Sequence, residues 1–232
     1  MRRLSIFILL SLITAAGLTG SPVCAESVDQ WFEKGLTFFN LGKYEEAIGA
    51  FDQALELEPK YLNVLYEKGN ALQELGKYEE AITTFNQIIQ LDPDYTKAWY
   101  KKGVALHELG KNKEAIVSYN QTLQLDPKNT DAWYKMGISL FDLELYERAN
   151  KTYDQVLQLD PGYAGAWYEK GLALEKLGKY EEANNAYDQA LQLNPENGEI
   201  WKGKGKVLEK LGRHEESVQA FEKALSYKSK NM

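Results

Sequence analysis

Residues 62–95 read LNVLYEKGNALQELGKYEEAITTFNQIIQLDPDY, and the chain repeats the pattern of this stretch with a period of 34 residues. A fixed period of this length indicates supersecondary units that stack on one another and share a continuous core. Six consecutive units fill the chain from Val28 to Asn231, and a proline closes the first five. The units are 28–61, 62–95, 96–129, 130–163, 164–197 and 198–231, and the prolines are Pro59, Pro93, Pro127, Pro161 and Pro195.

Each unit contains two predicted helices. In residues 62–95 the beginning of the unit, and later the stretch from Tyr78 to Leu91, carry apolar residues at spacings of three and four, which places them on one side of a helix. Gly76 lies between the two stretches and tolerates the left-handed backbone that ends a helix. The acidic pair that follows favours the positive start of the next helix. Pro93 lacks an amide hydrogen and restrains the residue before it, so the second helix ends there.

Three positions of the unit, numbered from 1 to 34, hold residues suited to close packing of the two helices. Position eight is always glycine, position 20 is alanine except for Ser217 in the last unit, and position 24 is always aromatic. We expect the small residues to let the helices approach, because a larger side chain at such a contact costs roughly 1–3 kcal/mol. The glycines are Gly35, Gly69, Gly103, Gly137, Gly171 and Gly205, and the aromatic residues are Phe51, Phe85, Tyr119, Tyr153, Tyr187 and Phe221.

With tryptophan at position four of most units, the pattern W-x3-G, A-x3-[FY] and P resembles the tetratricopeptide repeat family over residues 28–231. The resemblance implies an all-α fold, a right-handed superhelical solenoid of antiparallel helix pairs. It also implies that the first helices of the units line a concave groove that binds polypeptides. Residues 26–232 are therefore expected to form one domain of six repeats.

The fourth unit departs from the pattern at the turn between its helices, where Glu144 replaces the glycine. A residue with a side chain costs about 1 kcal/mol in a left-handed backbone position. We therefore expect a strained turn at Glu144. The alternative is a turn of another shape that accommodates the glutamate without strain.

The first 25 residues do not follow the repeat. A short basic start at 1–3 precedes an almost wholly apolar stretch at 4–16, and residues 23–25 read Val-Cys-Ala, which together predict a secretory signal peptide. Cleavage after Ala25 would leave a mature chain without cysteine and hence without disulfides. The alternative is an uncleaved membrane anchor at 4–20, although a spanning helix needs roughly 20 apolar residues.

The net charge of the chain is −7, and it is unevenly distributed. Residues 198–232 hold eight Lys or Arg against five Glu, a balance of +3, so the preceding units are acidic. An acidic body disfavours non-specific binding to nucleic acid, and we expect no nucleic-acid partner. We expect the last unit, with Ser217 in place of alanine, to be a solubilising end cap; contact of its basic residues with an anionic membrane or an acidic partner is the alternative.

The sequence offers no arrangement of residues typical of catalysis. The two histidines, His107 and His214, form no H-x3-H or H-E-x-x-H pattern, and no C-x-x-C or phosphate-binding G-x4-G-K-[ST] occurs. Adjacent acids such as Glu79 and Glu80 recur at the start of second helices, as is typical of a solvated charged face. Because repeats occupy nearly the whole mature chain, we predict a protein that is not an enzyme and holds no metal and no cofactor.

The resemblance places ligand-facing side chains at positions 2, 5, 6, 9, 12 and 13 of the first helices. Tyrosines at position five are suited to gripping apolar side chains and bonding a peptide backbone, although they can equally serve helix packing. Central lysines between Glu67 and Glu169 favour an acidic, partly apolar segment. His107 adds pH dependence below about 6.5 or is a solvated bystander. The predicted partner-binding residues are Tyr66, Asn70, Lys97, Tyr100, Lys101, Val104, His107, Tyr134, Lys135, Ile138 and Tyr168.

The sequence therefore predicts a scaffold that binds a protein or peptide in its concave groove. The signal peptide favours a location outside the cytoplasm, periplasmic, secreted or envelope-associated, with a role in assembling or tethering envelope machinery. Membrane contact is expected only through an uncleaved segment at 4–20. Two alternatives remain open: a structural repeat protein that associates with copies of itself, and a membrane-anchored assembly factor of the same repeat family.

Overall fold

The computed structural model describes residues 26–230, with side chains as far as Tyr227, and this part of the chain consists of helices joined by short turns. The stretch predicted to be a signal or an anchor lies outside the described residues. Each unit contributes a first and a second helix. The helices are α1 (Val28–Asn40), α2 (Tyr44–Leu57), α3 (Leu62–Glu74), α4 (Tyr78–Leu91), α5 (Thr96–Glu108), α6 (Asn112–Leu125), α7 (Thr130–Asp142), α8 (Tyr146–Leu159), α9 (Ala164–Lys176), α10 (Tyr180–Leu193), α11 (Gly198–Lys210) and α12 (His214–Lys230).

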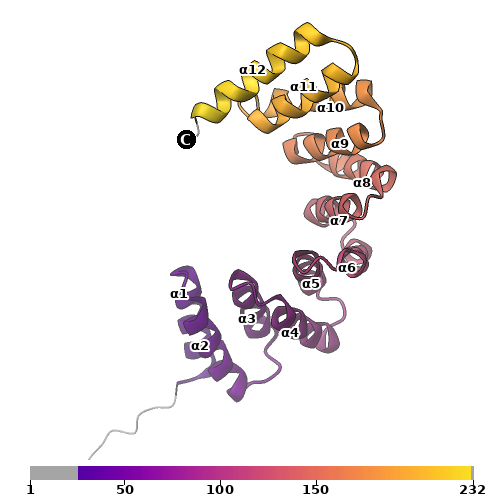
Figure 1. Cartoon of the computed structure of the whole chain (residues 1–232). Helices are drawn as coiled ribbons and strands as arrows, with labels where there is room; N and C mark the ends of the chain where they lie inside the picture. The colour runs from indigo at the N-terminus through magenta and orange to yellow at the C-terminus, as the bar shows by residue number, and fades with distance from the viewer. Residues whose placement is uncertain (1–25, 231–232) are drawn as a thin grey trace, which may run out of the picture.

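The helices form an arc. Each helix packs against the next one along the chain, and each first helix also contacts the first helix of the next unit. Within the described residues, no second helix contacts another second helix. The array therefore bends toward its first helices, and Figure 1 shows α3, α5 and α7 on the inner side of the arc. This architecture confirms the predicted all-α solenoid of helix pairs.

A left-handed turn ends each first helix. Gly76 has φ 71°, and the N–H of Lys77 donates to the carbonyl of Leu72 at 2.9 Å, which satisfies one of the last carbonyls of α3. The repeat thus ends its first helices with a turn that glycine adopts without steric cost. The same turn occurs at Gly42, Gly110, Gly178 and Gly212, with φ between 71° and 75°.

Glu144 adopts the same backbone conformation as these glycines. Its φ is 59°, and the N–H of Leu145 donates to the carbonyl of Leu140 at 2.9 Å, as in the other units. The predicted left-handed turn is confirmed, and the alternative of a differently shaped turn is wrong.

Glu144→Gly is expected to raise the free energy of unfolding by about 1 kcal/mol, because it removes the steric cost of a side chain at positive φ. Urea denaturation followed by circular dichroism measures the change. Gly76→Glu is the matched control, since a Cβ at Gly76 would meet nothing within 4 Å; this variant should lose a similar amount. A less stable Glu144→Gly protein would contradict the argument.

The turn between units is fastened by the tryptophan at position four. The indole Nε1–H of Trp99 donates to the carbonyl of Pro93 at 2.8 Å, across the turn that precedes α5. The proline thus has a second role, which its helix-ending property alone did not predict. The same bond, at 2.8–3.0 Å, joins Trp133 to Pro127, Trp167 to Pro161 and Trp201 to Pro195.

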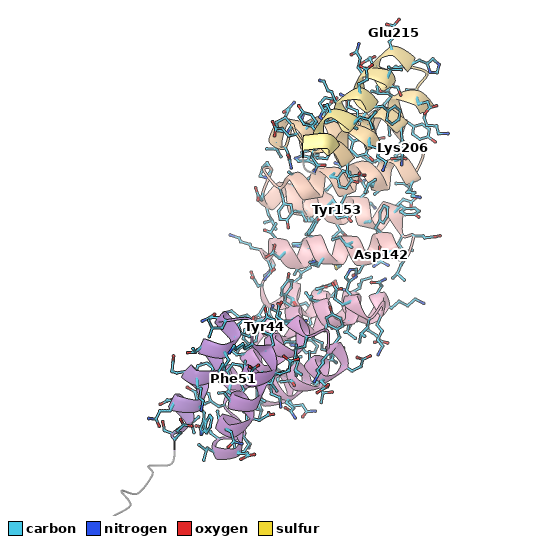
Figure 2. All side chains as sticks on the ribbon, turned by 60° about the vertical axis from the view of Figure 1, so that its left-hand side comes forward. Tyr44, Phe51, Asp142, Tyr153, Lys206 and Glu215 are labelled. Carbon is cyan, nitrogen blue, oxygen red and sulfur yellow. The ribbon has the colours of Figure 1, made fainter. Side chains whose placement is uncertain are left out.

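The core follows the repeat. The aromatic ring at position 24 is fully buried in each of the first five units. Two of these rings, Phe51 and Tyr153, are labelled in Figure 2. Each ring lies against the glycine at position eight of its own unit: a Cβ placed on Gly137 would be 2.4 Å from Cε1 of Tyr153. Carbon atoms pack at about 3.5–4.0 Å, so only glycine fits there. The expected close approach of the two helices is confirmed.

Ser217 does not have the role that the sequence suggested. Its side chain is only 4% exposed, and its hydroxyl donates to the carbonyl of Gly205 at 2.8 Å. The serine therefore joins α12 to α11 and does not solubilise the end of the array. The interpretation of Ser217 as part of an end cap is wrong.

Candidate functional site

The inner side of the arc brings the predicted position-five tyrosines into register, one on each of four consecutive first helices. Each is half-buried, and its ring lies 6.1–6.3 Å from the position-24 ring of its own unit, centroid to centroid. These tyrosines therefore do contribute to helix packing, which the sequence analysis had left as an alternative. One face of each ring supports the core, and the exposed remainder lines the groove. The four are Tyr66 on α3, Tyr100 on α5, Tyr134 on α7 and Tyr168 on α9.

Further tyrosines from the turns between units extend this aromatic surface. The ring centroid of Tyr163 lies 4.8 Å from that of Tyr134, and Tyr95 lies 5.9 Å from Tyr66. Both occupy position 34, the last of their units, and neither was among the predicted site residues. The signal in the sequence was a recurring aromatic residue at that position, directly before the next first helix.

Burial raises the pKa of the groove tyrosines further above the physiological pH range. It raises the pKa of Tyr100 to about 12, with a smaller contribution from the negative charge of Asp131, and it raises the pKa of Tyr134 to about 12, with Glu169 contributing. The hydroxyls remain hydrogen-bond donors throughout the physiological pH range. They can bond carbonyl or carboxylate oxygens of a bound chain.

Three predicted lysines lie on the central first helices without an ion pair. Lys97 and Lys101 are on α5 and Lys135 is on α7, and none has an acidic partner within the described residues. Lys68, Lys170 and Lys204, at position seven, behave differently. Each pairs with an aspartate of the preceding unit, as Lys68 does with Asp52 at 2.6 Å. The central lysines at positions two and six are thus available to an external anion.

Acidic groups border this cationic centre. Glu169, at position six of α9, is largely buried, and this burial raises its pKa to about 7, with the negative charge of Asp142 contributing. Burial raises the pKa of Tyr168 and the charge of Glu169 raises it further, so the carboxyl group lies near a groove tyrosine. Glu169 was not among the predicted site residues. The sequence could have indicated it, because Glu169 occupies position six, as Lys101 and Lys135 do in the two preceding units.

His107 is a structural residue within the groove. Its Nδ1 lies 2.9 Å from Oδ1 of Asn112, 3.3 Å from Oγ of Ser139 and 3.7 Å from Oδ2 of Asp142. These contacts join α5 to α6 and α7, and the side chain is 18% exposed. The interpretation of His107 as a solvated bystander is wrong.

The remaining predicted residues are held in place by their neighbours. Asn70 is nearly buried and its Nδ2 donates to Oε2 of Glu67 at 3.1 Å. Val104 and Ile138 are half-buried on α5 and α7, and Val104 packs against the core. Gln73, which was not predicted, donates to the carbonyl of Lys101 at 3.0 Å and so ties α3 to α5. The groove therefore has a preformed floor with apolar and amide side chains.

Family models of the tetratricopeptide repeat match the chain in overlapping segments. They cover residues 28–61, 50–83, 69–110, 105–144, 134–183 and 170–231. Together these matches span all six units. The chain belongs to the tetratricopeptide repeat family. No curated protein is similar enough in sequence to match it.

Solved structures share the fold of this tetratricopeptide repeat protein. A crystal structure of MamA is 25% identical, with a TM-score of 0.68, and the match covers 70% of this chain and 95% of MamA. A tetratricopeptide repeat protein from Parabacteroides merdae ATCC 43184 is 19% identical, with a TM-score of 0.76 and coverage of 88% and 80%. YrrB, described as having an unusual peptide-binding site, is 23% identical, with a TM-score of 0.63 and coverage of 73% and 87%.

The described part of this tetratricopeptide repeat protein contains no group of three or more His, Cys, Asp or Glu side chains that could hold a metal ion. Between residues 26 and 230, no helix is both long and apolar enough to cross a membrane. The groove thus offers hydrogen-bonding tyrosines, unpaired lysines and an apolar floor. Such groups can donate hydrogen bonds, pair with carboxylates and make apolar contacts.

Proposed function

We propose that residues 26–232 form a non-enzymatic scaffold that binds a polypeptide partner in the groove lined by α3, α5, α7 and α9. The observation that carries the proposal is the set of unpaired lysines, Lys97, Lys101 and Lys135, among tyrosines whose hydroxyls stay protonated. Membership of the tetratricopeptide repeat family and the likeness to YrrB, a protein with a peptide-binding site, support a protein-interaction role.

The partner that fits this groove is acidic and partly apolar. Carboxylates of the partner would meet the lysine ammonium groups, and charge complementarity of this kind favours the correct register and fast association. Its apolar side chains would lie against the tyrosine rings and against Val104 and Ile138. Glu67 and Glu169, on either side of the lysines, would disfavour an acidic segment that extends beyond the centre.

The proposed location is outside the cytoplasm, with a role in assembling or tethering envelope machinery. The support is the sequence of residues 1–25, which has the three regions of a secretory signal. If the stretch 4–20 were retained, the same scaffold would be anchored in a membrane. The second candidate, a self-associating structural protein, predicts a mass in light scattering that rises with concentration.

The groove is tested with Lys97→Glu, Lys101→Glu and Lys135→Glu combined in the mature chain. This variant is expected to lose capture of the wild-type protein's partners from extract of the source cells, because three attractive contacts become repulsive. Quantitative mass spectrometry of the captured proteins measures the loss. Equal helicity and melting temperature of the two proteins would show that the fold is intact.

The matched control makes the same triple Lys→Glu change at exposed lysines outside the groove. Lys60, Lys113 and Lys151 are exposed and lie outside the first helices, so the corresponding triple Lys→Glu variant has the same net charge as the groove variant. It should retain the partners. If both variants lose them equally, overall charge governs capture; if both retain them, the groove is not the binding site.

A further inference from the structure

The last unit exposes an apolar surface that is largely buried in the preceding units. At position 28, Leu225 is 69% exposed, whereas the leucines of units three to five are 7–8% exposed at that position. At positions 24 and 27, Phe221 and Ala224 are partly exposed, whereas their counterparts in all five preceding units are fully buried. The difference arises because no helix follows α12 to cover it within the described residues.

The interior units show what kind of helix covers this surface. The first helix of each following unit lays its positions three and ten against it, and these hold small or aliphatic residues with 0–2% exposure, such as Ala132 and Ser139 on α7. Position two of the following unit lies over the position-five side chain of the unit before it: a Cβ on Gly165 would be 3.1 Å from the hydroxyl of Tyr134. Position six of the following unit lies over the position-24 ring of the unit before it, since a Cβ on Gly203 would be 2.9 Å from Cζ of Tyr187.

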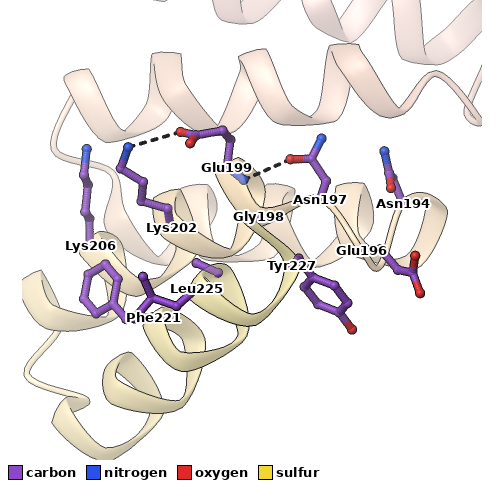
Figure 3. Close-up of a pocket in the computed structure, with 11 residues that line it drawn as sticks. Asn194, Glu196, Asn197, Gly198, Glu199, Lys202, Lys206, Phe221, Leu225 and Tyr227 are labelled. Atoms are coloured by element: carbon purple, nitrogen blue, oxygen red, sulfur yellow. Dashed lines mark hydrogen bonds and ion pairs between the residues drawn. The ribbon is translucent and has the colours of Figure 1, made fainter. Parts of the chain in front are cut away.

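In the last unit the uncovered surface forms a cavity of about 830 Å³ between α11, α12 and the turn before α11. Figure 3 shows Lys202 and Lys206 of α11 beside Phe221 and Leu225 of α12. Position five, a tyrosine or phenylalanine in the other units, is Lys202 here. Lys202 pairs with Glu199 at 3.2 Å at an exposed site, and Lys206 has no ion-pair partner within the described residues. The surface is therefore apolar, and its border carries Glu196 and Glu199 as well as the two lysines.

The opposite end of the array differs, because it is polar. On α1, position three is Gln30 and position ten is Thr37, and both are exposed. The corresponding residues of the other first helices are almost fully buried. A second copy could not cover the last unit with its α1 without burying these polar side chains, which costs free energy unless they find partners. Head-to-tail stacking of copies is disfavoured.

We propose that this surface, Phe221, Ala224 and Leu225 with Lys202 and Lys206, binds an amphipathic helix of another protein. That helix has small residues seven positions apart and an acidic residue directly before the first of them. The acid would lie over Lys202, as Asp131 on α7 lies close enough to raise the pKa of Tyr100 at the corresponding place. An acid in the first turn also suits the positive start of the helix. This site is separate from the groove and does not depend on it.

The probe is a peptide with the sequence of residues 129–142, NTDAWYKMGISLFD, because it contains the acid of Asp131 and small residues at Ala132 and Ser139. With a fluorescent label, its anisotropy is expected to rise saturably with the concentration of the full mature chain. Leu225→Glu should abolish saturable binding. Lys202→Glu should weaken it about tenfold, through loss of attraction and new repulsion.

Two controls separate this site from the groove and test the pairing. The triple groove variant, with Lys97, Lys101 and Lys135 changed to Glu, should bind the probe as wild type does. A probe with Asp131→Lys should bind wild type weakly and regain affinity with Lys202→Glu. Binding that survives Leu225→Glu, or that is lost in the groove variant, would overturn the proposal. So would a concentration-dependent dimer that Leu225→Glu dissociates, because the occupant would then be a second copy.

Discussion

Glu169→Gln is expected to raise the free energy of unfolding at pH 8 by no more than about 3 kcal/mol. Burial, with a contribution from Asp142, raises the pKa of Glu169 from its ordinary value of 4.5 to about 7. In the folded protein the carboxyl group therefore holds its proton over a pH range in which the unfolded chain has lost it. Above this range the folded protein contains an ionised group with little hydration, and this lowers its stability.

The sign of the pH dependence follows from the same shift. Since the folded state binds more protons between pH 4.5 and about 7, the contribution of Glu169 to stability falls as the pH rises through that window. The glutamine variant cannot ionise, so its advantage over wild type should be large at pH 8 and absent below about pH 4.5.

Urea denaturation of both proteins at several pH values between 4 and 8 measures this difference. Glu56→Gln is the control, because Glu56 is an exposed glutamate of α2 outside its first turn, and it should show no comparable stabilisation at pH 8. A constant difference between Glu169→Gln and wild type at all pH values would show that the carboxyl group does not titrate in this window.

Gly137→Ala is expected to lower the free energy of unfolding by roughly 1–3 kcal/mol, although alanine favours helices more than glycine does. The added Cβ would lie 2.4 Å from the ring of Tyr153, far inside contact distance. The ring is fully buried, so it cannot swing into solvent, and α7 must move away from α8. Thermal and urea denaturation both measure the loss.

Gly49 provides the comparison, since it is also a glycine within a helix but a Cβ there would meet nothing within 4 Å. Gly49→Ala should gain about 0.5–1 kcal/mol from helix propensity. A smaller partner should also relieve the clash: in a Tyr153→Leu background, the cost of Gly137→Ala is expected to shrink, as a double-mutant cycle would show. Equal effects at Gly49 and Gly137 would rule out the packing argument.

The repeat predicted the fold because its determinants are local and occur six times. The spacing of apolar residues and the closing prolines predicted the helix pairs, and the glycine at position eight predicted their close approach. The left-handed turn at Glu144 was also expected, because the residue stands where the other units have glycine, although a turn of another shape was the alternative. Each of these inferences needs only one unit and its immediate sequence.

The site was harder to predict because it depends on residues that differ between units. His107 is held by Ser139 and Asp142 of the next unit, and no spacing within one repeat indicates those contacts. The raised pKa of Glu169 likewise reflects burial together with the negative charge of Asp142 in the preceding unit. The open surface of the last unit depends on the absence of a following helix from the described chain, while its own residues still follow the repeat.

Because contacts are confined to neighbouring units, the arc can bend elastically along its length. Between residues 26 and 230, every contact between units joins one repeat to the next, so a small rotation at each junction adds along the array. The width between the two ends can then change by much more than any single pair of helices moves. A polypeptide bound on α5 and α7 would fix the angle between the two central units. The distance between the two ends of the array would therefore change when it binds.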